Sequence, residues 1–371
     1  MYNKIKILQH KEILKTIEVG KIETLAPVHV HLEVTEVCNF VCNFCAFHNP
    51  VKRADLPNFD FTGKRRLEFN RLLQLVDELA AAETQAIAFT GAGEQLLYPN
   101  LYKVLAKIRK NKIQFAVTSN LALPISDELI EELSHAQWIR WSLNAGQAET
   151  YQFLHNPKGN EPEKAFQLAQ INARRLIAAR QRNQTQLQLN ASFVVSTDNK
   201  ADIRQAAEIA QNAGVDGIAF RPDTSLERQE AQNAYVDETQ QAISQTKNEL
   251  ETDQFKVHIS ETRLTDVMRF HDLKLICYYS NHTSYIAANG DVYPCCYTRS
   301  DVRYVIGNIN QQDFRTLWAS AHRQGFFKKL LLKKCPSCPY GETNEVLKYL
   351  YEGQKQADDL YVPAEKVDYF I

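Results

Sequence analysis

The 371-residue chain carries 43 basic and 44 acidic residues, for a net charge of -1, and 44% of its residues are hydrophobic. This balance gives no electrostatic case for a nucleic-acid or membrane partner, and no apolar run is long enough for a transmembrane helix. The N-terminus lacks the apolar core of a signal peptide, so we expect a cytoplasmic protein. In that compartment its 8 cysteines are expected to bind metal rather than form disulfides.

Strand and helix patterns alternate along the first two thirds of the chain. The expected strands are residues 28–35, 85–90, 113–118, 137–143, 187–195 and 216–221. Expected helices cover 67–82, 99–111, a segment starting at 126, 162–182 and 201–213. Such alternation is typical of parallel βαβ units. Six units rather than eight suggest an open barrel, so we predict an α/β fold built as a partial (β/α)6 TIM-like barrel.

The composition and residue pattern of the sequence change after residue 224. We expect an N-terminal extension over 1–27, the barrel core over 28–224 and a polar helical linker over 225–260. Residues 261–371 are rich in Cys and Tyr and are expected to form a small C-terminal domain that ends in a helix.

Three cysteines follow the first expected strand with the spacing C-x3-C-x2-C: Cys38, Cys42 and Cys45. Thiolates select soft metals such as iron–sulfur clusters, zinc or Cu(I). A four-iron cluster held by three cysteines keeps one iron open, whereas a closed zinc site would need a fourth ligand such as His48.

This pattern, with Phe44 just before the last cysteine, resembles the radical S-adenosylmethionine (SAM) enzymes. The resemblance implies a [4Fe–4S] cluster whose open iron is chelated by SAM, and an electron donor such as flavodoxin or ferredoxin. It also implies reductive cleavage of SAM and abstraction of a hydrogen atom from a substrate C–H bond, in a barrel of the kind predicted above.

A second loop follows the second expected strand and reads Gly91-Ala-Gly93-Glu94-Gln95. Glycine lets the backbone approach a ligand closely, and a carboxylate can bind an ammonium group. The loop resembles the Gly-Gly-Glu-type loop that holds the amino group of SAM in this family. Gln95 stands where Pro is commoner, which puts the stiffness of the loop in doubt.

Polar residues also stand near the ends of the later strands. They could donate hydrogen bonds to the ribose or carboxylate of SAM or to a substrate, or they could be structural. These candidates are Ser119, Asn120, Ser142, Asn144, Ser192 and Arg221.

The other five cysteines lie in the C-terminal third: Cys277, Cys295, Cys296, Cys335 and Cys338. Four thiolates make a closed site for either zinc or a [4Fe–4S] cluster, and the chemistry alone does not choose between them. The wider pattern, with Asn-Gly-Asp-Val-Tyr-Pro-Cys, Gly-Asn-Ile, Leu-Trp-x-Ser and a final C-x2-C, resembles the SPASM/Twitch extension of radical SAM enzymes.

That resemblance implies the shorter Twitch type, with one auxiliary [4Fe–4S] cluster bound by Cys277, Cys295, Cys335 and Cys338. Cys296 is then the spare cysteine, although an exchange of roles with Cys295 stays open. An auxiliary cluster can take the second electron of an oxidation. We therefore expect an oxidoreductase that dehydrogenates a substrate.

Several alternatives remain open at this stage. The short stretch before the first strand leaves little room for a leader-peptide-binding domain, which favours a small molecule such as an aminocyclitol or sugar over a ribosomal peptide. A redox-neutral epimerisation or rearrangement would make Cys296 the candidate catalytic residue, as a hydrogen-atom donor. A non-enzymatic iron–sulfur or zinc interaction module is the third class.

Overall fold

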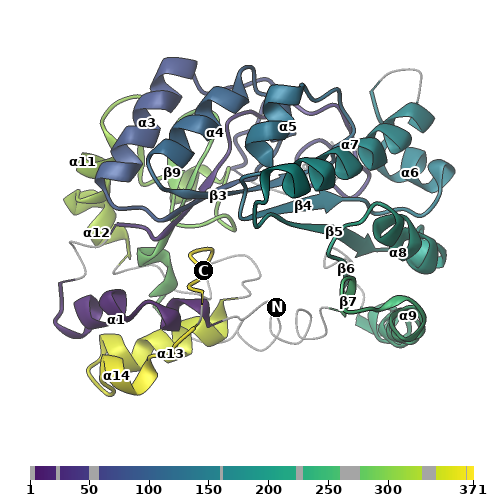
Figure 1. Ribbon diagram of the computed structural model, residues 1–371. Coiled ribbons are helices and arrows are strands. Elements are labelled where there is room, and N and C mark those ends of the chain that lie inside the picture. Colours follow the sequence, from purple (N-terminus) through teal and green to yellow (C-terminus); the bar gives the residue numbers. More distant parts are fainter. Residues whose placement is uncertain are drawn as a thin grey trace.

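The computed structural model describes residues 5–21, 26–49, 58–158, 162–222, 229–259, 276–327, 340–364 and 366–371. These residues include one ten-stranded sheet with the order β10-β9-β8-β1-β2-β3-β4-β5-β6-β7 (Figure 1). The strands are β1 (His29–Leu32), β2 (Ala86–Phe89), β3 (Gln114–Ser119), β4 (Trp138–Ser142), β5 (Gln188–Val195), β6 (Gly217–Pro222), β7 (Lys256–Ile259), β8 (Thr283–Ile286), β9 (Asp291–Tyr293) and β10 (Gly307–Asn308).

Strands β1 to β6 are the six that the sequence predicts, and neighbouring members pair in parallel. The fold is the predicted partial barrel. The sheet extends beyond the prediction on both sides. β7 pairs in parallel with β6 although its residues lie in the expected helical linker, and β8 pairs in parallel with β1. β8, β9 and β10 are antiparallel, so the C-terminal part of the chain continues the sheet of the barrel.

Helices α3, α4, α5, α7 and α8 lie along one side of the sheet (Figure 1). The bounds of these and their neighbours are α3 (Phe69–Ala81), α4 (Leu101–Lys110), α5 (Asp127–Leu133), α6 (Ala148–His155), α7 (Pro162–Asn183), α8 (Ile203–Asn212) and α9 (Gln229–Leu250). Side chains cap two of the helix starts: Glu68 accepts from Asn70 and Arg71, and Ser126 accepts from Leu129. Helix α6 was not predicted.

The remaining helices belong mainly to the chain ends. They are α1 (Lys11–Glu18), α11 (Phe314–Trp318), α12 (Ala321–Phe327), α13 (Gly341–Tyr351) and α14 (Ala357–Leu360). Single 3-10 turns are η1 (Lys6–Gln9), η3 (Gln95–Leu97), η4 (Lys200–Asp202), η5 (Tyr279–Asn281) and η6 (Val302–Tyr304). Leu14 of α1 and Leu347 of α13 share one buried cluster, so the two ends of the chain pack together. None of the described helices is long and apolar enough to cross a membrane.

The two faces of β1 have different neighbours because side chains alternate along a strand. Val30 and Leu32 belong to the large core shared with the helices. On the other face, the ring of His29 lies 5.3 Å from Phe370 near the C-terminal end of the chain. Phe370 packs on Ala86 and Ala116, two small side chains that leave space for its ring. The tail therefore covers the interior face near the N-terminal ends of the strands, and the loops that follow the strands lie at the opposite edge.

Candidate functional site

The cysteine loop follows β1 at the C-terminal end of the sheet, the edge where α/β barrels place their chemistry. Cys38, Cys42 and Cys45 are all partly exposed. Backbone N–H groups point at two of the sulfurs. The N–H of Phe40 donates to Cys38 Sγ at 3.4 Å, and the N–H of His48 donates to Cys45 Sγ at 3.3 Å. Such bonds stabilise negative sulfur, the form in which cysteine binds a metal.

The electrostatics of the loop show why its sulfurs need a positive partner. Burial raises the pKa of the Cys38 thiol to about 12, and the negative charge of Glu94 raises it further. Burial also raises the pKa of Cys42, and the charges of Cys45 and Cys38 raise it further. The charges of neighbouring cysteines thus oppose the ionisation of Cys38 and Cys42. A cationic cluster would remove that opposition, so the residues present fit such a group.

The zinc alternative finds no support in the described geometry. The Nε2 atom of His48 lies 3.1 Å from the carbonyl oxygen of Glu36. In the part of the chain that the structure describes, no three His, Cys, Asp or Glu side chains come together around a point that one metal ion could occupy. A four-iron cluster is larger than one ion and holds its cysteines further apart.

The end of α6 and the segment that follows it support the cysteine loop. The N–H of Asn43 donates to the carbonyl of Leu154 at 2.9 Å, and the N–H of Lys158 donates to the carbonyl of Asn39 at 2.9 Å. The Lys158 ammonium donates to the carbonyl of Cys38 at 2.8 Å. Residues more than a hundred positions downstream therefore fix the shape of the loop.

The glycine loop after β2 packs against the segment that connects β1 to Cys38. A Cβ atom at Gly93 would lie 2.5 Å from the carbonyl oxygens of Thr35 and Val37, and a Cβ at Gly91 would lie 2.5 Å from the Glu33 side chain. Both positions require glycine because the neighbouring chain fills the space that a side chain would need. The two loops are therefore held in contact.

Glu94, in the glycine loop, is 4% exposed. It accepts hydrogen bonds from the N–H of Asn120 at 2.8 Å and the N–H of Leu96 at 3.2 Å. Burial raises the pKa of Glu94, whereas these bonds and one from Ser119 act to lower it. Since its charge raises the pKa of Cys38, the carboxylate lies within electrostatic reach of the candidate cluster.

Gln95 resolves the doubt about the stiffness of this loop. It is fully buried and makes several hydrogen bonds. Its Oε1 accepts from the N–H of Val34 at 2.8 Å, and its Nε2 donates to the carbonyls of Thr35 at 3.1 Å and Gly93 at 2.8 Å. The side chain therefore ties the loop to the end of β1, which restrains it in place of the ring of a proline.

The other polar candidates lie at the same edge of the sheet, but several make structural bonds. Ser119 Oγ accepts from the N–H of Leu121 at 2.9 Å, and Asn120 Nδ2 donates to Asn39 Oδ1 at 2.9 Å. Asn144 Oδ1 accepts from the N–H of Val194 at 2.8 Å, which links the ends of β4 and β5.

The strand register places three further candidates, and a ring contact places a fourth. Ser142 and Ser192 are directly opposite each other on β4 and β5, and Arg221 pairs with Val194 where β6 ends. The ring of Phe44 lies edge-on to His155, with the centroids 5.6 Å apart.

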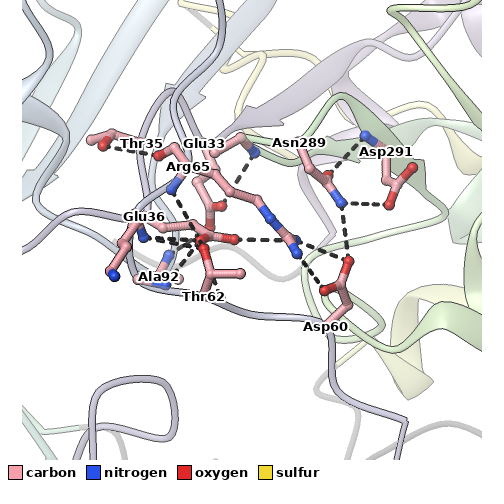
Figure 2. Close-up of polar contacts among 12 residues, drawn as sticks. Glu33, Thr35, Glu36, Asp60, Thr62, Arg65, Ala92, Asn289 and Asp291 are labelled. Atoms are coloured by element: carbon pink, nitrogen blue, oxygen red, sulfur yellow. Dashed lines mark hydrogen bonds and ion pairs between the residues drawn. The ribbon is translucent and has the colours of Figure 1, made fainter.

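A buried carboxylate that the sequence analysis missed organises the loop before α3. Glu36 is 3% exposed. Its Oε2 accepts from the hydroxyl of Thr62 at 2.8 Å and from the backbone N–H groups of Gly63 at 2.9 Å and Arg65 at 3.3 Å (Figure 2). This carboxylate, two residues before Cys38, thus shapes a chain segment that contacts the cysteine loop, where the ring centroids of Phe61 and Phe47 lie 5.7 Å apart.

Arg65 continues this network toward the C-terminal part of the chain. Its guanidinium binds both carboxylate oxygens of Asp60, at 2.9 and 2.5 Å. Asn289, in the turn between β8 and β9, donates to Asp60 at 3.3 Å and to Asp291 at 2.6 Å. Figure 2 shows these contacts running from Glu36 to the β8–β9 turn. The cysteine loop is therefore tied to the C-terminal hairpin.

Glu33 makes a second connection between the same parts. It is 2% exposed and follows β1. Its Oε2 accepts from the Tyr285 hydroxyl at 2.5 Å and the N–H of Ala92 at 2.6 Å, and its Oε1 accepts from the N–H of Ala288 at 3.2 Å. One sequence signal could have identified Glu33 and Glu36: both are acidic residues at the point where the first strand leads into the cysteine loop.

Arg299 lies between the cysteine loop and the C-terminal hairpin. Its guanidinium is 4.8 Å from the ring centroid of Phe47 and 5.9 Å from that of Tyr285. It also donates to the carbonyl of Cys296. The Cys296 side chain packs against a cluster that contains Tyr285 and Tyr293. Cys296 is therefore next to residues that contact the barrel.

Two candidate auxiliary ligands lie close together. Cys277 and Cys295 are 6% and 9% exposed. Burial raises the pKa of Cys277 to about 11, and the charge of Cys295 is the next largest cause. Cys335 and Cys338, the other two expected ligands, lie outside the described residues.

Comparisons with known proteins agree with this arrangement. The family model of the radical SAM superfamily matches residues 32–218, half of the chain, and that of SPASM, an iron–sulfur cluster-binding domain, matches residues 277–339. No curated protein matches the chain in sequence.

Three solved structures illustrate the likeness of fold. Streptococcus suis SuiB bound to S-adenosylmethionine is 15% identical with a TM-score of 0.57, over 91% of this chain and 76% of that one. SuiB bound to the precursor peptide SuiA is 15% identical with a TM-score of 0.59, over 94% and 78%. Native anSMEcpe with bound AdoMet is 14% identical with a TM-score of 0.50, over 90% and 99%. The chain belongs to the radical SAM superfamily: it is an enzyme that uses SAM and a [4Fe–4S] cluster, and it carries a SPASM-type domain that binds auxiliary iron–sulfur.

Proposed function

We propose that Cys38, Cys42 and Cys45 hold the SAM-binding cluster, and that the glycine loop binds the methionine end of SAM. The observation that carries this proposal is the contact between the two loops, with the Glu94 carboxylate within electrostatic reach of Cys38. When bound and reduced, the cluster and SAM supply the radical that removes a hydrogen atom from the substrate. The chain's own part is to present backbone groups at Gly91 and Gly93 and a negative charge to the SAM ammonium.

The polar residues at the strand ends complete the proposed SAM site. Phe44 and the ends of β3 to β6 surround the same edge of the sheet, where hydrogen bonds to ribose and carboxylate groups would form. The residues assigned to this role are Ser119, Asn120, Ser142, Asn144, Ser192 and Arg221.

We assign the C-terminal domain, residues 261–371, to the Twitch type with one auxiliary [4Fe–4S] cluster. Its ligands would be Cys277, Cys295, Cys335 and Cys338, and the closeness of the first two supports this choice. Two clusters correspond to about eight irons per chain. Replacing Cys38, Cys42 and Cys45 together with Ala should leave about four irons. Stoichiometric zinc in anaerobically purified protein would reject the assignment.

The proposed reaction is oxidation of an alcohol or amine carbon in a small molecule such as an aminocyclitol or sugar. After loss of the hydrogen atom, the substrate must release one electron and one proton to become oxidised. An auxiliary cluster supplies the electron acceptor when bound, and the polar links from Glu33 and Glu36 hold the C-terminal hairpin against the barrel. Reduced flavodoxin or ferredoxin is the proposed source of the initiating electron.

A redox-neutral epimerisation is the second candidate, because Cys296 packs against the cluster of Tyr285, whose hydroxyl donates to Glu33 just after β1. As a thiol it would return a hydrogen atom to the substrate. Turnover in deuterated buffer separates the two reactions. Oxidation predicts no deuterium at the product carbon and unchanged turnover in Cys296→Ala. Deuterium incorporation by the wild type, lost in a variant that still makes 5′-deoxyadenosine, would establish the alternative.

A peptide substrate is the alternative substrate class, since SuiB, which has a similar fold, binds a precursor peptide. The two classes can be compared by adding synthetic aminocyclitols, sugars or peptides to the anaerobic, reduced protein. Stimulation of 5′-deoxyadenosine formation together with a two-dalton loss from a small molecule supports the proposal. Stimulation only by peptides would move the assignment to peptide maturation.

A further inference from the structure

His155 is a buried histidine whose ring touches the proposed cluster loop. It is the last residue of α6 and is 1% exposed. Its Nδ1 atom lies 3.2 Å from Cys42 Sγ. The rings of Phe40 and Tyr151 pack on it with centroids at 5.2 and 4.4 Å, which fixes the orientation of the imidazole.

The other ring nitrogen has two neighbours of opposite character. Nε2 lies 3.3 Å from the carbonyl oxygen of Leu143, which can only accept, and 3.5 Å from Nδ2 of Asn144, which can only donate. The orientation of the Asn144 amide is set elsewhere, because its Oδ1 accepts from the N–H of Val194 at 2.8 Å. The amide N–H2 group therefore faces the histidine.

Whether Cys42 is a thiol or a thiolate decides which of these two neighbours forms a hydrogen bond with Nε2. A free thiol can donate to Nδ1, and Nε2–H then donates to Leu143. A cysteine bound to iron is a thiolate and can only accept, so Nδ1 must carry the proton to make a favourable contact. In the neutral imidazole Nε2 is then an acceptor, and Asn144 provides the donor that this tautomer needs.

We propose that His155 donates an Nδ1–H hydrogen bond to the Cys42 thiolate, with its tautomer held by Asn144, and thereby raises the reduction potential of the SAM-binding cluster. This inference rests on the assignment of Cys42 as a ligand under the proposed function. A hydrogen bond to sulfur is stronger when the cluster has gained an electron, so it favours the reduced state. His155 is a positioning residue in this account, and Asn144 acts through it.

The test is a potentiometric titration of the holoprotein followed by the EPR signal of the reduced cluster. The signal that changes on addition of SAM identifies the cluster concerned. His155→Phe removes both ring nitrogens, and His155→Gln keeps an amide only toward the Nε2 end. Both should reduce the ratio of reduced to oxidised cluster at a fixed potential about fivefold. For a one-electron couple this is a shift of about 40 mV to lower potential.

His155→Asn is the matched variant, because its amide nitrogen can take the place of Nδ1 and keep the donor toward Cys42. Its midpoint potential should stay near that of the wild type. Phe166→Leu controls for packing. The ring centroids of Phe166 and Tyr151 lie 4.9 Å apart, and Phe166 takes no part in the hydrogen bond between His155 and Cys42. It should not change the potential. Equal potentials for wild type and a fully loaded His155→Phe would overturn the proposal, as would equal potentials for the Asn and Gln variants.

A measurement on the wild type covers the case in which the variants do not load a cluster. With 15N-histidine incorporated, pulsed EPR of the reduced cluster should detect a nitrogen-15 coupling from one imidazole. Absence of that coupling would refute the hydrogen bond. Failure of the proposed function is distinguishable, because then the wild type would bind no cluster whose signal responds to SAM.

Discussion

The side chain of Glu33 occupies the space beside Gly91. A Cβ atom added at Gly91 would lie 2.5 Å from both Cγ and Oε2 of Glu33. The same carboxylate accepts hydrogen bonds from Ala92, Tyr285 and Ala288. One buried group thus joins the first strand, the glycine loop and the C-terminal hairpin. Gly91 is glycine because Glu33 fills this space, whatever contact its backbone makes with SAM.

Gly91→Ala should therefore lower stability, because the added methyl group collides with a side chain that is fixed by three hydrogen bonds. Overpacking of a buried site typically costs about 1–3 kcal/mol. Urea unfolding under anaerobic conditions measures the change. Gly325→Ala is the matched control, since a Cβ atom there meets nothing within 4 Å and residue 325 lies in a helix. Equal loss of stability in both variants would contradict the steric account.

Glu33 should also make stability depend on pH. Burial raises the pKa of its carboxyl, so the folded protein holds this proton more tightly than the unfolded chain does. As the pH rises from the ordinary carboxyl pKa through the raised value, the unfolded chain releases its proton first and the free energy of unfolding falls. Glu33→Gln should remove this part of the pH dependence.

The substitution has its own cost, because a glutamine amide turns an N–H2 group toward one of the backbone donors of Ala92 and Ala288. A buried donor left without an acceptor costs about 1–3 kcal/mol. The difference in the free energy of unfolding between wild type and Glu33→Gln should therefore be largest at low pH and decrease as the pH rises. Glu149→Gln, at an exposed position, is the control. A difference that stays constant with pH would show that Glu33 does not titrate in this window.

The barrel could be predicted because most of its strands and helices are specified by residue patterns within short stretches of sequence. Each of the six strands is a short apolar or β-branched run, most are followed by a helix of 3.6-residue periodicity, and all six appear at the predicted places. Helix α6 was missed because Phe153 is exposed while Tyr151 and His155 are buried, which blurs the apolar stripe. β7 was missed although Phe255, Val257 and Ile259 alternate with polar residues, because this short strand follows a polar helical pattern that was extended over residues 225–260.

Contacts between distant parts of the chain could not be predicted in the same way. His31 pairs with Tyr285, and Cys42 meets His155, across long separations in sequence. No local pattern specifies such pairs, because packing of the whole sheet brings them together. The motif residues Gly93 and Glu94 could be picked out by their residue types, whereas Glu33 and Glu36 required knowledge of what surrounds them.

Gln95 provides a test of how the glycine loop is held. Gln95→Ala leaves the buried N–H of Val34 without its acceptor and removes two further bonds to backbone carbonyls. We expect a loss of about 1–3 kcal/mol in stability and weaker SAM binding, measured by equilibrium dialysis on the anaerobic holoprotein. Gln85→Ala is the control, because its side chain makes one exposed bond, to Glu83. Unchanged SAM affinity in Gln95→Ala would mean that this side chain does not hold the loop in its binding shape.

The most direct test of the whole account is the formation of 5′-deoxyadenosine from SAM by the anaerobically reconstituted, dithionite-reduced protein. The wild type should form it, and Cys42→Ala should form none, because two thiolates do not hold the cluster. Glu94→Ala should keep its iron and bind SAM more weakly, since the ammonium group loses its charged partner. The account would be contradicted by a fully loaded wild type that leaves SAM intact, or by a Cys42→Ala variant that cleaves SAM as fast as the wild type.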